Sequence, residues 1–158
     1  MRRTRFLVAT VAAAALLAGA TTVGVAGNAA ADDDDGEGAA RQFGALLTGA
    51  AEVPGPGDMD GAAAVVVRTR AGSNQVCVTA FATNQIDPPT LFHIHEGDPT
   101  VAGPVVVDFV PLLPAGVGCV KVDRKLTRAI VRNPGNYYFN IHNDAFPAGA
   151  VRGTLVGF

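Results

Sequence analysis

The sequence predicts an all-β protein, an antiparallel sandwich or barrel of about eight strands with one short helix. Two observations predict this class. From Gln42 onward, short apolar runs rich in β-branched residues recur about every ten residues, and clusters of Gly, Pro, Asn and Asp separate them. Several of these runs also alternate apolar and polar residues, which is the pattern of a strand with one face in a core.

Eight segments fit the strand pattern. Pro54-Gly55-Pro56-Gly57 and Asn133-Pro134-Gly135-Asn136 are the plainest breaks between them, and residues 71–74 are short enough to join two strands as a hairpin. The predicted strands cover residues 43–48, 62–70, 75–83, 91–95, 105–110, 117–122, 137–142 and 150–156.

One segment, residues 123–133, breaks the strand pattern. Leu126, Ala129 and Ile130 recur there at helical spacing, Asp123 is placed to cap the N-terminus, and Pro134 would end the helix. We therefore predict a single short helix in this segment.

The start of the chain has the pattern of a secretory signal peptide. A basic head of Arg2, Arg3 and Arg5 precedes an uncharged run from Phe6 to Ala20, and Ala29-Ala30-Ala31 offers a small-residue cleavage site. An uncleaved membrane anchor is the alternative, although the Ala, Gly and Thr content favours a cleaved signal. We therefore expect a secreted or cell-surface protein with a signal peptide over residues 1–31, an acidic, disordered leader over 32–41 and a β-sandwich domain over 42–158.

Charge and cysteine usage narrow the function classes. Without the three arginines of the signal peptide, nine Lys and Arg face fourteen Asp and Glu, a formal net charge of −5 that argues against nucleic-acid binding. After signal removal we expect no membrane association. In an exported chain, Cys77 and Cys119 are expected to form a disulfide, and the alternative of two soft metal ligands lacks zinc-site spacing.

The three histidines fall on the polar faces of their predicted strands. Side chains alternate along a strand, so His93 and His95 share one face, about 7 Å apart. By the same alternation His142 lies opposite Phe139 and Ile141. Arg152 likewise falls on the polar side of the closing strand. If the three strands are neighbours, these side chains form one patch on the outside of the sheet.

This histidine patch has two interpretations. His93, His95 and His142 could bind one copper or zinc ion, with Glu96, Asp98 or Asp144 as a carboxylate ligand or partner of a ligand. Alternatively, the imidazoles hydrogen-bond to one another and to backbone, and hold the loops at residues 96–103 and 143–149 over the sheet. Arg152 could order a nearby loop or bind an anion. No nucleophile elbow, P-loop or dinucleotide motif is present, so no catalysis is assigned.

Four segments in order resemble the CHRD domain family, named for its occurrence in chordin and also found in many exported bacterial proteins. They cover nearly all of residues 43–158 and are Leu46–Pro54, His93–Gly97, Asn133–His142 and Gly149–Leu155. The resemblance implies an extracellular β-sandwich or barrel module. It implies no established activity for the bacterial members.

A second resemblance is to copper/zinc superoxide dismutases. His93-Ile94-His95 resembles their histidine-x-histidine copper strand, and residues 149–157 with Arg152 resemble their closing glycine-rich strand. This similarity implies an Ig-like or dismutase-like sandwich with His142 as a further copper ligand. Those enzymes also need a bridging histidine and two more zinc histidines, and the three histidines of this chain leave none for them. The count excludes a dinuclear site but permits a single-metal relative.

We therefore expect a secreted single domain with a binding or surface-structural role and a histidine patch for one copper or zinc ion. Two alternatives stay open. The first is a mononuclear copper redox protein in which Arg152 attracts an anion. The second is a metal-free module that presents its loops to an extracellular protein or polymer partner.

Overall fold

The computed structural model describes residues 40–158, which form an antiparallel β structure with one α-helix. The predicted signal peptide and most of the predicted leader lie outside the described residues. The strands are β1 (Arg41–Thr48), β2 (Ala62–Arg70), β3 (Gln75–Asn84), β4 (Leu91–Glu96), β5 (Val105–Asp108), β6 (Gly118–Lys121), β7 (Tyr137–His142), β8 (Val151–Thr154) and β9 (Val156–Gly157), and the helix is α1 (Arg124–Arg132).

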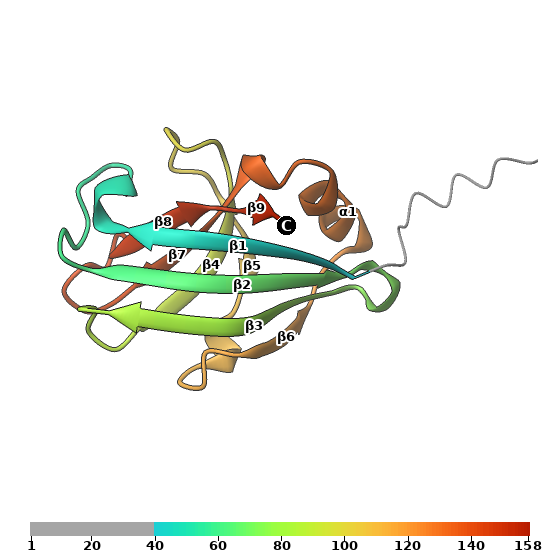
Figure 1. The fold of residues 1–158 in the computed structure, drawn as a ribbon, viewed down its shortest axis with the longest axis horizontal. Coiled ribbons are helices and arrows are strands. Elements are labelled where there is room, and N and C mark those ends of the chain that lie inside the picture. The colour runs from blue at the N-terminus through green and yellow to red at the C-terminus, as the bar shows by residue number, and fades with distance from the viewer. Residues whose placement is uncertain (1–39) are drawn as a thin grey trace, which may run out of the picture. The chain divides into compact units, whose positions relative to one another are not determined.

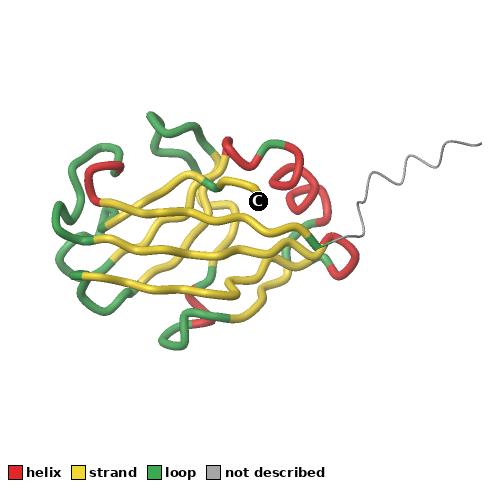
Figure 2. The backbone as a smooth tube through the Cα atoms, in the orientation of Figure 1, coloured by secondary structure: helices red, strands yellow, loops and turns green. Residues whose placement is uncertain are grey.

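All the described strands belong to one sheet with the order β5-β4-β7-β8-β1-β2-β3-β6, and β9 pairs with β1. The sheet curls into a nearly closed barrel, so that β1, β2, β3 and β6 lie in front of β4, β5 and β7, and β8 lies beside β1 (Figure 1). Figure 2 shows that loops cluster at both ends of the strands. The all-β class and the single short helix predicted from the sequence are confirmed.

The core fills the space between the two halves of the curled sheet. On one side Phe92 and Ile94 of β4 face inward with Phe139 of β7, and all three side chains are fully buried. The aromatic rings pack edge-on or in offset stacks, with ring centroids 6.0 Å apart for Phe92 and Phe139. The other side contributes Val65 and Val67 of β2 and Val76 and Val78 of β3.

Several predicted strand limits differ from the structure by one or two residues, and two of these differences have a clear local cause. The strand predicted to end at residue 110 ends at Asp108, whose carboxylate accepts a hydrogen bond from the Val110 amide at 2.8 Å and so favours a turn there. The strand predicted for residues 150–156 is divided at Leu155. The Leu155 amide still donates to Tyr137, whereas Val156 pairs with Gly44 of β1. Since β8 pairs with both β7 and β1, the chain leaves β7 after Leu155 and continues along β1.

The helix has the predicted cap. The Asp123 side chain accepts a hydrogen bond from the Lys125 amide at 2.7 Å. Thr127 and Ile130 face the core and are fully buried. No helix among residues 40–158 has the length and apolar character needed to cross a membrane.

The two cysteines lie opposite each other on paired strands. Cys77 of β3 pairs with Cys119 of β6, and their sulfur atoms lie at disulfide distance. The cysteine pair therefore links β6, the strand at the end of the sheet, to β3.

Candidate metal centre

Two neighbouring strands bring the three histidines together. In the antiparallel β4–β7 pair, Leu91 lies opposite His142 and His93 lies opposite Asn140. β8 follows as the next strand, with Arg152 opposite Asn140. The sequence left the adjacency of these three strands open, and the structure shows that they are neighbours in the sheet.

The histidine face is not an open outer surface. His95 is 9% exposed, His142 7% and Arg152 2%. The reason is that loops fold back over this side of β4, β7 and β8. The face lies outside the hydrophobic core, but these loops shield it from solvent. The patch predicted on the outside of the sheet is therefore a largely buried polar cluster, in which the His93 side chain is 12% exposed.

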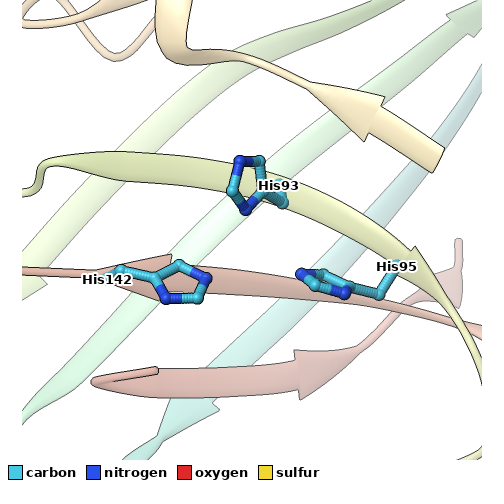
Figure 3. A group of neighbouring side chains, drawn as sticks. All are labelled: His93, His95 and His142. Carbon is cyan, nitrogen blue, oxygen red and sulfur yellow. The ribbon is translucent and has the colours of Figure 1, made fainter. Parts of the chain in front are cut away.

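The three imidazoles surround a common space. Ring centroids lie 5.6 Å apart for His93 and His95, 5.3 Å for His93 and His142, and 6.4 Å for His95 and His142. One ring nitrogen from each histidine lies within 4.8 Å of the others. Figure 3 shows the three side chains converging from the two strands.

Hydrogen bonds on the far side of two rings determine which nitrogens face this space. His95 Nδ1 lies 2.9 Å from the Gly103 carbonyl oxygen, and His142 Nδ1 lies 3.0 Å from that of Pro147. A carbonyl oxygen only accepts, so both Nδ1 atoms must carry the proton, which leaves the Nε2 lone pairs free. Within residues 40–158, His93 Nδ1, His95 Nε2 and His142 Nε2 are buried and have no hydrogen-bond partner.

Burial also favours the uncharged form of each ring. Desolvation lowers the pKa of His93, His95 and His142 below the ordinary value. For His93 the neighbouring His142 lowers the pKa further, while Asp108 raises it. Neutral imidazole is the form that binds a metal, so the three rings are held in the ligand state near neutral pH.

The three nitrogens lie near the spacing that one transition-metal ion requires of its ligands. With bonds of about 2.0 to 2.1 Å, the nitrogens bound to one ion lie about 3.3 to 3.6 Å apart. The three nitrogens lie within 4.8 Å of one another, so ring movements of about 1 Å or less would bring them to that spacing. No other group of three His, Cys, Asp or Glu residues in the described part of the chain has such geometry.

The family comparison agrees with this architecture. A family model described as the CHRD domain matches residues 43–155. The chain belongs to the CHRD domain family. No curated protein and no solved structure matches the chain. All three histidines and Arg152 lie inside the part that matches the CHRD domain.

The carboxylate beside the histidine triad belongs to Asp108, which was not among the site residues predicted from the sequence. Asp108 Oδ1 lies 3.7 Å from His93 Nε2, on the side of the ring away from the other two histidines. Its only sequence signal is a position just after an apolar run, and the pairing of Asp108 with His93 depends on strand register.

The predicted carboxylates lie elsewhere in the CHRD domain. Glu96 is exposed and lines a surface cavity with Lys125 and Tyr137. Asp98 accepts hydrogen bonds from the Thr100 amide and hydroxyl, which lower the pKa of its carboxyl group. Asp144 is exposed in the loop after β7.

Arg152 is held by the loop that follows β4. Its guanidinium donates hydrogen bonds to the carbonyl oxygens of Asp98, Pro99 and Val101, at 3.1, 3.2 and 3.1 Å. It also lies over the Tyr138 ring, 3.7 Å from the centroid. These contacts order the loop, and they leave a 2% exposed side chain with little access for an anion.

A buried acid, Glu52, completes the polar cluster. It is 6% exposed, and Asn140 Nδ2 donates to its Oε2 at 3.4 Å. Burial raises the pKa of Glu52 to about 7, although the charge of Arg152 and the Asn140 hydrogen bond lower it. Gly149 has φ +146°, and a Cβ there would lie 2.5 Å from Glu52 Oε2, so glycine is needed beside the carboxyl group. Glu52 lies outside any alternating strand pattern, so the sequence did not predict it as a site residue.

Proposed function

We propose that this CHRD domain is a secreted binding module that holds one copper or zinc ion. The ligands are His93 Nδ1, His95 Nε2 and His142 Nε2. One observation carries the proposal: three buried imidazole nitrogens face one another without a hydrogen-bond partner in the described part of the chain. Neutral imidazoles without thiolates suit both zinc and copper. Export is supported by the signal pattern and by the cysteine pair at disulfide distance.

The residues around the ligands have separate tasks. The carbonyl groups of Gly103 and Pro147 fix the tautomers of His95 and His142. Asp108 lies against the outer nitrogen of His93 and favours a proton there, which directs the lone pair of Nδ1 inward. A bound ion would supply Lewis acidity, or electron transfer in the case of copper.

A purely structural histidine network is less well supported. Such a network predicts hydrogen bonds among the imidazoles, yet within residues 40–158 the three inward nitrogens have none. The bonds from His95 and His142 to loop carbonyls are the part of that network that exists. They serve a metal site equally well, because they orient the ligands.

A metal titration tests the proposal. The purified mature protein should bind one equivalent of Cu²⁺ or Zn²⁺, measured by competition titration and by metal content after desalting. His93→Ala should abolish this binding, because only two ligands remain. Asp144→Ala is the matched control, since this exposed acid lies in the loop bonded to His142, and it should bind as the wild type does. Absence of binding at micromolar metal contradicts the proposal.

A copper redox protein is the second candidate, and the three-ligand set favours it. Sites with three protein ligands leave one coordination position for water or a small molecule, as catalytic sites do. If copper binds, assays of superoxide consumption and of substrate oxidation by the loaded protein distinguish catalysis from storage. Activity no greater than that of the His93→Ala protein would limit the role to binding.

A further inference from the structure

Tyr138 connects Arg152 to a histidine of the triad. The ring planes of His95 and Tyr138 are nearly parallel, with centroids 4.9 Å apart and an interplanar angle of 9°. The Arg152 guanidinium carbon lies 3.7 Å from the Tyr138 centroid. Both groups cannot occupy the same face of the ring at these distances. Tyr138 therefore lies between the imidazole and the guanidinium, and the three side chains form a stack.

The loop at residues 97–104 is bonded to every member of this stack. Gly103 accepts from His95 Nδ1 at 2.9 Å and donates to the Tyr138 hydroxyl at 3.1 Å. Arg152 donates to three carbonyl oxygens of residues 98–101. A Cβ at Gly103 would collide with the Glu96 carbonyl oxygen, so only glycine brings this backbone so close. One loop thus controls the orientation of one ligand.

We propose that Arg152 and Tyr138 are positioning residues of the metal site, and that ordering of loop 97–104 and metal binding are one coupled equilibrium. This inference rests on the proposed function. The physical reason is that a single His95 ring bonds the loop through Nδ1 and the ion through Nε2. An ordered loop holds Nε2 in place before the ion arrives, so less ordering remains to be done on binding. A bound ion in turn holds the ring against the loop.

Coupling of this kind is reciprocal. If the loop raises metal affinity by some factor, the metal must raise the stability of the closed loop by the same factor. Loss of groups that orient metal ligands lowers affinity by about 10- to 100-fold. The effect of the loop on metal affinity and the effect of the metal on loop stability are the two halves of this cycle, and each can be measured independently.

Variants that loosen the loop without removing a ligand test the first half. Tyr138→Phe deletes the hydroxyl that Gly103 bonds and keeps the ring. Asp98→Ala deletes the acceptor for Thr100, where the amide lies 2.7 Å from the carboxylate. The matched control is Asp123→Ala, which removes a contact of the same kind and length at the start of α1. We expect zinc affinity to fall about tenfold in the first two variants and to stay unchanged in the control.

Arg152→Lys separates positioning from charge. Lysine keeps the positive charge beside Glu52 but cannot reach three carbonyl groups with a planar fork. The Cu²⁺ electron paramagnetic resonance spectrum should change in Arg152→Lys and Tyr138→Phe, because His95 reorients, and should match the wild type in Asp123→Ala. If Arg152→Lys fails to fold, Tyr138→Phe and Asp98→Ala still carry the test.

Amide hydrogen exchange tests the second half of the cycle. Zinc should slow exchange at Thr100 and Gly103, and exchange within α1 should stay unchanged. Suppose instead that the wild type binds zinc and His93→Ala does not, while the loop variants keep full affinity and zinc leaves the loop amides unaffected. That result overturns this inference and leaves the proposed function standing. A wild type that binds no metal overturns both.

Discussion

Glu52 is a buried acid whose pKa differs between the folded protein and the unfolded chain, so it contributes to the pH dependence of stability. Its carboxyl group is buried near the cation Arg152 and receives hydrogen bonds from the Asn140 side chain, at 3.4 Å, and from the Val53 backbone. These interactions do not offset the cost of removing a charge from water, so the pKa rises from its usual 4.5 to about 7. The lowered pKa values of the histidines act on stability in the opposite direction, since they favour folding as pH rises.

The Glu52 effect predicts a stability difference that depends on pH. Between pH 4.5 and 7 the folded protein keeps the Glu52 proton while the unfolded chain releases it. The raised pKa therefore makes the Glu52 contribution to the free energy of unfolding fall as pH rises, by about 3 kcal/mol across this window. Glu52→Gln has no titrating carboxyl group at this position, so its free energy of unfolding lacks this pH-dependent contribution. Urea unfolding of both metal-free proteins at the two pH values should show the variant gaining by that amount relative to the wild type, and parallel profiles would contradict it.

Among the secondary-structure elements, the helix α1 has the N-terminal cap that its local sequence predicts. Asp123 caps α1 by accepting from the Lys125 amide, as its position in the sequence predicts. Ile130 on the inner side is fully buried, so the cap and the packing act on the same element. The cap satisfies an amide that has no partner inside the helix.

Removal of the cap should destabilise the domain without changing its fold. Asp123→Ala is expected to lower the free energy of unfolding by about 1 kcal/mol, because the Lys125 amide loses its acceptor. Denaturant unfolding measures this change. Asp87→Ala, at an exposed aspartate in the loop after β3, is the control and should change stability little. Equal effects of the two substitutions would show that the cap contributes nothing.

At the scale of the whole molecule, the cysteine pair and the histidine triad lie on different halves of the curled sheet. Cys77 and Cys119 join β3 to β6, whereas the triad lies on β4 and β7. Closing a covalent loop with a sequence separation of 42 restricts the unfolded chain. Stability and metal affinity should therefore respond separately to loss of the cysteines.

The double variant Cys77→Ala/Cys119→Ala tests this separation. Its free energy of unfolding should be about 4 kcal/mol lower than that of the oxidised wild type, from the chain-entropy cost of the loop. Zinc affinity of the folded fraction should be unchanged. The wild type under a strong reductant is the control and should lose similar stability. A reductant without effect would show that the two cysteines are not bonded.

Alternation along strands accounts for what could be predicted of the site. It assigned His93, His95 and His142 to polar faces because side chains in a strand alternate whatever the strand pairs with. Asp108 could not be predicted, since its approach to His93 depends on the register of β4 with β5, including a shift between Ile94 and His95. Glu52 could not be predicted because a loop, which has no period, carries it into the cluster.

By itself, the sequence determined the β class, most strand limits to within two residues, the capped helix and the side of the sheet on which the histidines lie. These features follow from local spacing and turn chemistry, which act between near neighbours in the chain. Only the tertiary structure decided that β4, β7 and β8 are adjacent, that loops bury the polar face, and that Tyr138 contacts both His95 and Arg152. Those contacts join residues up to about fifty positions apart. Their geometry depends on the packing of the whole domain, and no local pattern records it.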